Sequence, residues 1–175
     1  TQAPLVRFVP QGPAASRALD AAVDAAGNIY VFWIFNDPFT FGDTALPHEP
    51  WSVMTASAWD IFVASLDPLG NPRWITVTST PGGVNSSGGI AVDAAGRVTL
   101  TGVDVGGVFV RRYEPDGALL WARKFDSPSS VYARSIALDA AGNIYIAGQH
   151  GGDLDFGGGV LSASNFGHAF VASFT

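Results

Sequence analysis

The side chains that could do chemistry are three histidines and two aspartates close together in the sequence. His48 stands in a segment rich in aromatic residues, whereas His150 and His168 flank a glycine-rich segment with Asp153 and Asp155. A histidine pair beside a carboxylate can supply a general base and a metal ligand. The spacing matches no zinc motif, and no serine stands in a Gly-x-Ser-x-Gly turn. We therefore expect no catalytic residues, and a metal-assisted hydrolase or lyase using His150, His168 and Asp155 is the last alternative.

Asp153 and Asp155 also raise the question of a calcium site. Alternating aspartates in a glycine-rich loop can offer a hard cation two carboxylates plus carbonyl oxygens. A similar segment earlier in the chain has Thr40 where this one has Asp155, so the charge pattern does not repeat. We expect these residues to shape a tight turn and expect no cofactor, with calcium at Asp153 and Asp155 as the alternative.

Aromatic residues offer a binding chemistry. The segment 35–59 gathers phenylalanine, tryptophan and histidine, and exposed rings can stack on sugars or receive a partner protein. The alternative is that these rings fold back on their own sheet, which the recurrence of Phe41-Gly42 as Phe156-Gly157 favours. The candidate binding residues are Trp33, Trp51, Trp59, His48, His150 and His168.

Three internal repeats must position these residues. The tetrapeptide Asp-Ala-Ala-Gly occurs at residues 24–27, 93–96 and 139–142. A second apolar segment occurs at 61–66, 108–113 and 169–174. Asp at the start of such a turn accepts backbone hydrogen bonds, and Gly at its fourth position takes the left-handed conformation that closes a hairpin. Because no stretch has helical periodicity, each copy is predicted as strand, turn, strand, loop, strand, turn, strand, in an all-β chain.

Tandem four-stranded antiparallel units predict the blades of a β-propeller. The first strand of each unit is built from Ala, Ser and Gly, which suits a crowded axis, while Trp74 and Trp121 fall on the fourth strands, where blades splay. A β-sandwich does not predict this repeated gradient of side-chain size. We expect one propeller or half-propeller domain over residues 1–175, with blades at about 17–78, 86–126 and 132–175.

The third unit ends after its third strand. An apolar segment at 4–9 stands about as far before Asp24 as Phe125 stands before Asp139. We expect this segment to be a fourth strand that completes a terminal blade, in this chain or in a partner chain. Three blades are fewer than the ~4–8 of ordinary propellers, so the expected partner is a second copy or the remainder of a longer propeller.

Three segments carry a family resemblance, at residues 139–148, 154–159 and 170–173. Together they resemble the bacterial β-propeller repeats of secreted and cell-surface proteins, the SBBP-like repeats. The resemblance extends over all three copies, although Trp33 replaces Gly148 of the third copy and His168 replaces Asp60 of the first. It implies an extracytoplasmic location and a binding or scaffolding role.

The composition excludes several classes of protein. A formal net charge of −6 argues against nucleic acid as a partner, and 47% apolar residues argue against disorder. The chain has no cysteine and no apolar run long enough to span a membrane. Together with what the resemblance implies, the predicted function is a non-enzymatic, secreted or cell-surface module for protein interaction or self-assembly. The first alternative is a carbohydrate-binding, lectin-like propeller, so a glycan or protein ligand is expected.

Overall fold

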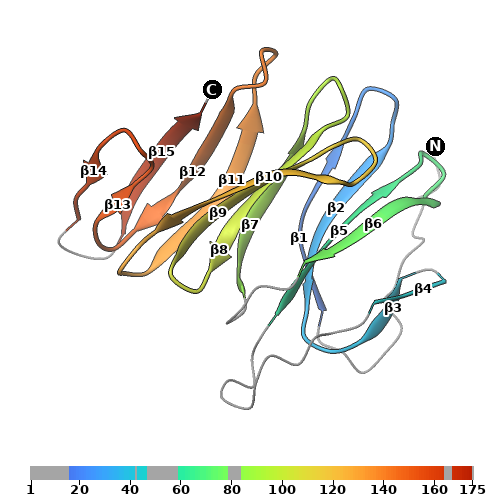
Figure 1. The fold of residues 1–175 in the computed structure, drawn as a ribbon, viewed down its shortest axis with the longest axis horizontal. Coiled ribbons are helices and arrows are strands. Elements are labelled where there is room, and N and C mark those ends of the chain that lie inside the picture. Colours follow the sequence, from blue (N-terminus) through green and yellow to red (C-terminus); the bar gives the residue numbers. More distant parts are fainter. Residues whose placement is uncertain (1–15, 42, 47–58, 79–83, 164–166, 175) are drawn as a thin grey trace, which may run out of the picture.

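The computed structural model describes residues 16–41, 43–46, 59–78, 84–163 and 167–174. All of its regular structure is β, and three antiparallel sheets follow one another along the molecule (Figure 1). This confirms the all-β fold class and the four-stranded antiparallel units. The predicted strand at 4–9 lies outside the described residues, as do His48 and Trp51. No helix long and apolar enough to cross a membrane occurs in the described part of the chain.

The first and second sheets have four strands each. The first sheet consists, in order, of β1 (Ser16–Val23), β2 (Ile29–Phe35), β5 (Asp60–Leu66) and β6 (Pro72–Thr78). The second sheet consists of β7 (Val84–Val92), β8 (Val98–Asp104), β9 (Gly107–Tyr113) and β10 (Leu119–Asp126). In both sheets the order in space equals the order in sequence, because each strand is joined to its neighbour by a hairpin or by a longer loop between the second and third strands.

The third sheet has three strands among the described residues. They are β11 (Val131–Leu138), β12 (Ile144–His150) and β15 (His168–Phe174). Two small hairpins interrupt the long loops of the first and third sheets. These are β3 (Phe39–Phe41) with β4 (Thr44–Leu46), and β13 (Leu154–Asp155) with β14 (Val160–Leu161).

The Asp-Ala-Ala-Gly turns behave as their sequence predicts. Asp24 Oδ1 accepts hydrogen bonds from the backbone N–H groups of Ala26 and Asn28, and the N–H of Gly27 donates to the Asp24 carbonyl. Gly27 has φ of +83° and Gly142 has φ of +86°, a conformation that a residue with a Cβ rarely adopts. The turn is therefore closed by its own residues, before any contact with another sheet.

The first strands of the three sheets lie next to one another. β7 contacts β1 on one side and β11 on the other. A Cβ added to Gly89 would lie 3.1 Å from the backbone nitrogen of Ile136 and 3.3 Å from Cα of Ser135, so only a very small residue fits there. This packing is the physical reason for the small residues that the sequence places on the inner strands.

Three apolar cores hold the sheets. The first core lies between the first and second sheets and includes Tyr30, Val63 and Phe109. The second core lies between the second and third sheets and includes Val110 and Phe170. A third core covers the far face of the first sheet, where the β3–β4 hairpin packs over β2 and β5; its buried members are Phe35, Phe41, Leu46, Phe62, Ala64 and Leu66.

Candidate functional site

The two histidines of the third sheet come together as the sequence suggests. His150 ends β12 and pairs in register with His168, the first residue of β15, and their ring centroids are 6.1 Å apart. His150 is buried, and its Nδ1 donates to the Gly152 carbonyl at 2.6 Å. One ring nitrogen of His150 is thus already hydrogen-bonded within its own loop, whereas His168 is exposed.

The two aspartates of this loop are exposed, and one of them stabilises the turn that follows it. Both Asp153 and Asp155 are exposed, and Asp155 Oδ1 accepts the N–H groups of Gly157 at 2.7 Å and Gly159 at 3.1 Å. Within the residues that the structure describes, no group of three His, Cys, Asp or Glu side chains is placed to hold a metal ion. The hydrogen bonds of Asp155 favour the expected turn over the calcium alternative.

Trp33 and Trp59 pack against their own sheet. Trp33 is half-buried and stacks on Phe62 at 5.8 Å with an interplanar angle of 18°, and Phe41 meets it edge-on. Trp59 is half-buried beside the first core, with the Arg17 guanidinium 5.9 Å from its ring centroid. The contacts of Phe41 favour the fold-back interpretation for that residue of segment 35–59, and sugar binding stays a prediction.

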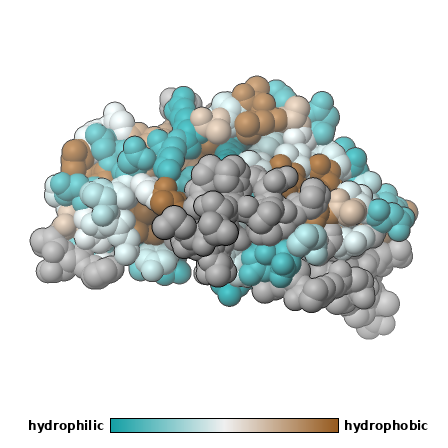
Figure 2. Space-filling view, turned by 60° about the horizontal axis from the view of Figure 1, so that its bottom comes forward, coloured by the Kyte–Doolittle hydropathy of each residue, from teal (hydrophilic) through white to brown (hydrophobic). Residues whose placement is uncertain are grey.

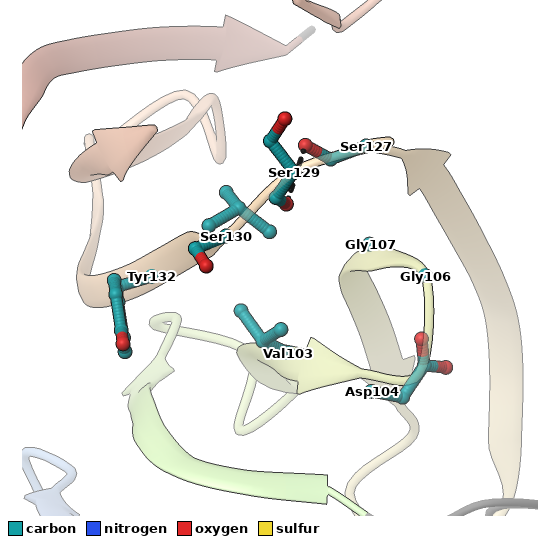
Figure 3. Close-up of a pocket in the computed structure, with 9 residues that line it drawn as sticks. Val103, Asp104, Gly106, Gly107, Ser127, Ser129, Ser130 and Tyr132 are labelled. Atoms are coloured by element: carbon teal, nitrogen blue, oxygen red, sulfur yellow. Dashed lines mark hydrogen bonds between the residues drawn. The ribbon is translucent and has the colours of Figure 1, made fainter. Parts of the chain in front are cut away.

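Sequence reasoning missed a polar cavity at one end of the second and third sheets. It has a volume of about 180 Å³ and lies between the β8–β9 turn and the connection from β10 to β11 (Figure 3). Ser127, Ser129 and Ser130 line one side, and Asp104 lies on the other. Lys124 Nζ pairs with Asp104 Oδ1 at 2.9 Å, so the cavity presents hydroxyl groups rather than an unpaired charge. No single motif signals it, because its residues come from two separate turns.

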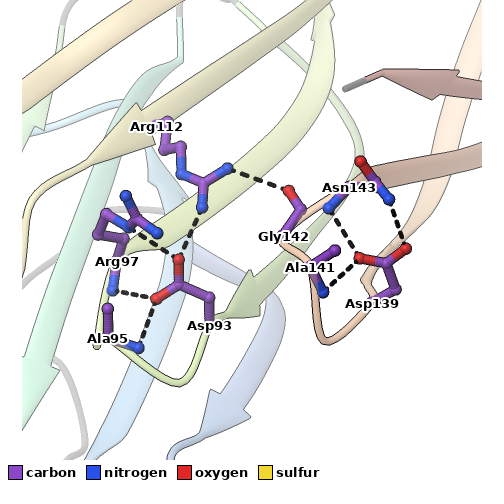
Figure 4. A network of polar contacts seen from close by, with 8 residues as sticks. All are labelled: Asp93, Ala95, Arg97, Arg112, Asp139, Ala141, Gly142 and Asn143. Carbon is purple, nitrogen blue, oxygen red and sulfur yellow. Dashed lines mark hydrogen bonds and ion pairs between the residues drawn. The ribbon is translucent and has the colours of Figure 1, made fainter.

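A network of polar contacts joins the turns of the second and third sheets (Figure 4). Asp93 Oδ2 accepts from Arg97 Nε at 2.8 Å and from Arg112 Nη2 at 2.7 Å. Arg112 also donates through Nη1 to the Gly142 carbonyl of the third sheet, at 3.4 Å. The equivalent carboxylate of the third sheet, Asp139, accepts instead from Asn143 Nδ2 at 2.7 Å. The second sheet thus reaches its neighbour through a buried arginine.

The turn carboxylates have lowered pKa values. Burial alone would raise the pKa of Asp93, but hydrogen bonds from Arg97 and Arg112 outweigh it and hold that pKa below its ordinary value. Hydrogen bonds from Asn143 are the main cause of the lowered pKa of Asp139. The other turn carboxylates with lowered pKa values are Asp24 and Asp67.

These pKa directions predict loss of stability in acid. A carboxylate whose pKa is lower in the folded chain stabilises that state above its unfolded pKa of about 3.9 and loses this contribution as the pH falls through the folded value. We expect the urea midpoint of unfolding to be steady from pH 7 to about 5 and to fall below about 4. Urea titrations followed by tryptophan fluorescence at stepped pH values measure this dependence. A midpoint that stays constant down to pH 2 would contradict it.

The outward side of the third sheet carries an apolar surface on β12 and β15. The strands β12 and β15 alternate between residues buried against the second sheet and residues that face away from it. We call the second set the open face; it consists of Tyr145, Ala147, Gln149, Ala169, Val171 and Ser173. Ala147 lies opposite Val171 and Tyr145 opposite Ser173. Figure 2 shows small hydrophobic areas between hydrophilic ones at the end of the molecule formed by this sheet, on the left.

The open face corresponds to faces that are buried elsewhere in the chain. Val171 occupies the repeat position of Val63 in the first sheet and Val110 in the second. Val63 and Val110 are 0% and 1% exposed because the next sheet covers them, whereas Val171 is 73% exposed. Tyr145 is 39% exposed at the position where Tyr30 is 1% exposed. The third sheet thus presents the surface that its predecessors use to bind the following sheet.

Tandem antiparallel sheets that touch through their first strands are the arrangement of β-propeller repeats. Residues 120–154, from β10 to the start of β13, match the family model described as the SBBP beta-propeller repeat. The chain therefore carries a repeat of the SBBP family, and the resemblance inferred from the sequence is confirmed.

Comparison with whole proteins adds no function. No curated protein matches the chain. Among solved structures, a protein of unknown function from Bacteroides caccae is similar at 11% sequence identity and a TM-score of 0.38, over 85% of this chain and 61% of that one. This chain thus spans about 61% of the length of that protein.

Proposed function

We propose that the chain is a non-enzymatic, secreted or cell-surface propeller module that binds protein, and that it assembles with a second copy of itself through the third sheet. The observation that carries this proposal is the exposure of Val171 at 73%, against 0% and 1% at the equivalent Val63 and Val110. Burial of apolar surface stabilises by roughly 25 cal/mol per Å², so an exposed apolar surface on a sheet is a favourable place for a partner.

The edge of the third sheet supports the same proposal. β5 and β9 each pair with a fourth strand, whereas β15 has, among the described residues, only β12 as a neighbour. An unpaired strand edge is a template for another strand. A hollow of about 190 Å³ runs beside this edge, lined by Val171, Ser173 and the β13–β14 residues Phe156 and Leu161.

We propose residues 4–9 of a second copy as the strand that fills this edge. The segment is apolar and has the repeat position of β6 and β10. Each chain then contributes three blades, the last completed by the first strand of its partner. The extracytoplasmic location rests on the resemblance to repeats of secreted and cell-surface proteins.

The proposal is tested by the native mass of Val171→Asp. We expect the natural chain to sediment as a dimer or larger species and Val171→Asp to sediment at the mass of one chain, 18.2 kDa, because the buried carboxylate has no partner. Leu69→Asp is the matched control, since Leu69 is 65% exposed in the β5–β6 turn of another sheet. A natural chain that stays at 18.2 kDa at every concentration, or a Val171→Asp chain that associates normally, overturns the proposal.

A further inference from the structure

We infer that the open face binds the first sheet of a second copy, in the head-to-tail order that joins the first sheet to the second and the second to the third. This inference rests on the proposed self-assembly and adds to it the identity of the surface that is bound. The two sheet-to-sheet contacts inside the chain supply the geometry.

Both internal contacts join unlike faces. The first core contains Tyr30 and Val63 from one face of the first sheet and Leu100 and Phe109 from the opposite face of the second sheet. In the second core, Val110 from the second sheet meets the equivalent opposite face of the third sheet. We call the face that carries Val63, Val110 or Val171 the forward face, and the opposite face of each sheet the rear face. In each contact, the forward face of one sheet packs on the rear face of the next sheet. A further contact of this kind, on the open face of the third sheet, therefore requires a sheet whose rear face is not covered.

The first sheet supplies that rear face. Ile29, Val31 and Trp33 of β2 point to this side and are half-buried. The equivalent residues of the second and third sheets are fully buried against a preceding sheet; they are Val98, Leu100, Ile144 and Ile146. No sheet precedes the first one in the described part of the chain. The large ring of Trp33 also complements the small side chains of the open face, because close packing requires large residues to meet small ones.

The β3–β4 hairpin supports this assignment. Its counterpart, β13–β14, contacts β10, the fourth strand of the preceding sheet, where Phe156 lies 5.0 Å from Phe125 between ring centroids. Phe41 takes the place of Phe156 in the first sheet and lies 4.8 Å from Phe62. In the head-to-tail assembly, Phe41 of the second copy lies against the β15 edge of the third sheet, where the proposed function places residues 4–9 of that same copy.

The turns define the register of the contact. The Tyr30 hydroxyl lies 3.8 Å from the position of a Cβ added to Gly96, and Arg112 donates to the Gly142 carbonyl. Each forward face thus reaches the turn glycine of the next sheet. Tyr145 has the repeat position of Tyr30, so in this register its hydroxyl lies against Gly27 of the second copy.

Disulfide cross-linking tests the contact, because the chain contains no cysteine. The position of a Cβ on Gly89 is 3.1 Å from Ile136 N, and the equivalent pair in the head-to-tail contact is Ser135 with Ala21 of the second copy. These residues lie on the first strands of the two outer sheets, with the second sheet between them (Figure 1). A disulfide in the Ala21→Cys, Ser135→Cys variant must therefore join two chains.

We expect this double variant to form covalent dimers and larger species under mild oxidation, resolved on a non-reducing gel. Either cysteine alone should give no more product than Leu69→Cys, which reports random collision of an exposed thiol. Circular dichroism checks that each variant is folded. A double variant with no cross-link above the Leu69→Cys level overturns the inference.

Val171→Cys distinguishes this inference from the proposal on which it rests. A disulfide from Val171→Cys alone, together with no product from the double variant, means that two open faces pack on each other. That result overturns the head-to-tail contact but leaves self-assembly intact. A natural mass of 18.2 kDa with no cross-link in any variant overturns both.

Discussion

Replacing Asp93 with alanine is expected to lower the free energy of unfolding by about 3–5 kcal/mol, because it leaves a buried arginine without its counterion. The Asp93 side chain is 6% exposed and that of Arg112 is 9% exposed. The change also removes hydrogen bonds to the backbone N–H groups of Ala95 and Arg97, which close the β7–β8 turn. Urea unfolding followed by tryptophan fluorescence measures the loss.

Two further variants separate the ion pair from the turn. Asp139→Ala removes the same backbone contacts from the third sheet, but no arginine of the described residues is bonded to Asp139, so we expect a smaller loss. In the double variant Asp93→Ala, Arg112→Met, no charge remains buried at this place, and part of the stability should return. Equal losses for Asp93→Ala and Asp139→Ala would contradict this account.

Replacing Phe62 with alanine is expected to cost about 3–5 kcal/mol as well, through the cavity left in the third core. Phe62 is fully buried between Trp33, which stacks on it, and Phe41, which meets its edge at 4.8 Å. Because the side chain holds the β3–β4 hairpin against the sheet, the change should also raise the exposure of Trp33. The measurements are urea unfolding and acrylamide quenching of tryptophan fluorescence.

Phe62→Leu is the control for this variant. Leucine keeps most of the buried volume, so we expect it to cost about half as much as alanine or less. If Phe62→Ala unfolds at the same urea concentration as the natural chain, Phe62 does not hold the hairpin, and the fold-back interpretation of segment 35–59 fails with it.

The sequence was most informative where structure is local. The turns at Asp24, Asp93 and Asp139 were predicted because each carboxylate bonds to residues two and four positions further on. The strands that flank them were predicted for a similar reason, since the alternation of apolar residues reports which side of a sheet is buried. Because the sequence repeats three times, a turn or strand predicted in one copy was also predicted at the equivalent residues of the other two.

Contacts between repeats could not be predicted in this way. Arg112 bridges Asp93 and the Gly142 carbonyl, and no motif around it in the sequence indicates the contact with the third sheet. The serine-lined cavity likewise depends on how the second and third sheets meet. Such contacts join residues that are far apart in the sequence. A single sequence does not indicate how close these residues lie in space.

The turn carboxylates bear on how such chains grow in evolution. Each Asp-Ala-Ala-Gly turn bonds mainly to its own next few residues, so a duplicated stretch of gene would encode a hairpin that closes wherever it is inserted. Only the residues that reach the turn of the next sheet, such as Tyr30 and Arg112, have to suit a new neighbour. Lengthening the protein by unequal crossing-over would therefore demand few compensating mutations, and the number of repeats can change faster than the repeat itself.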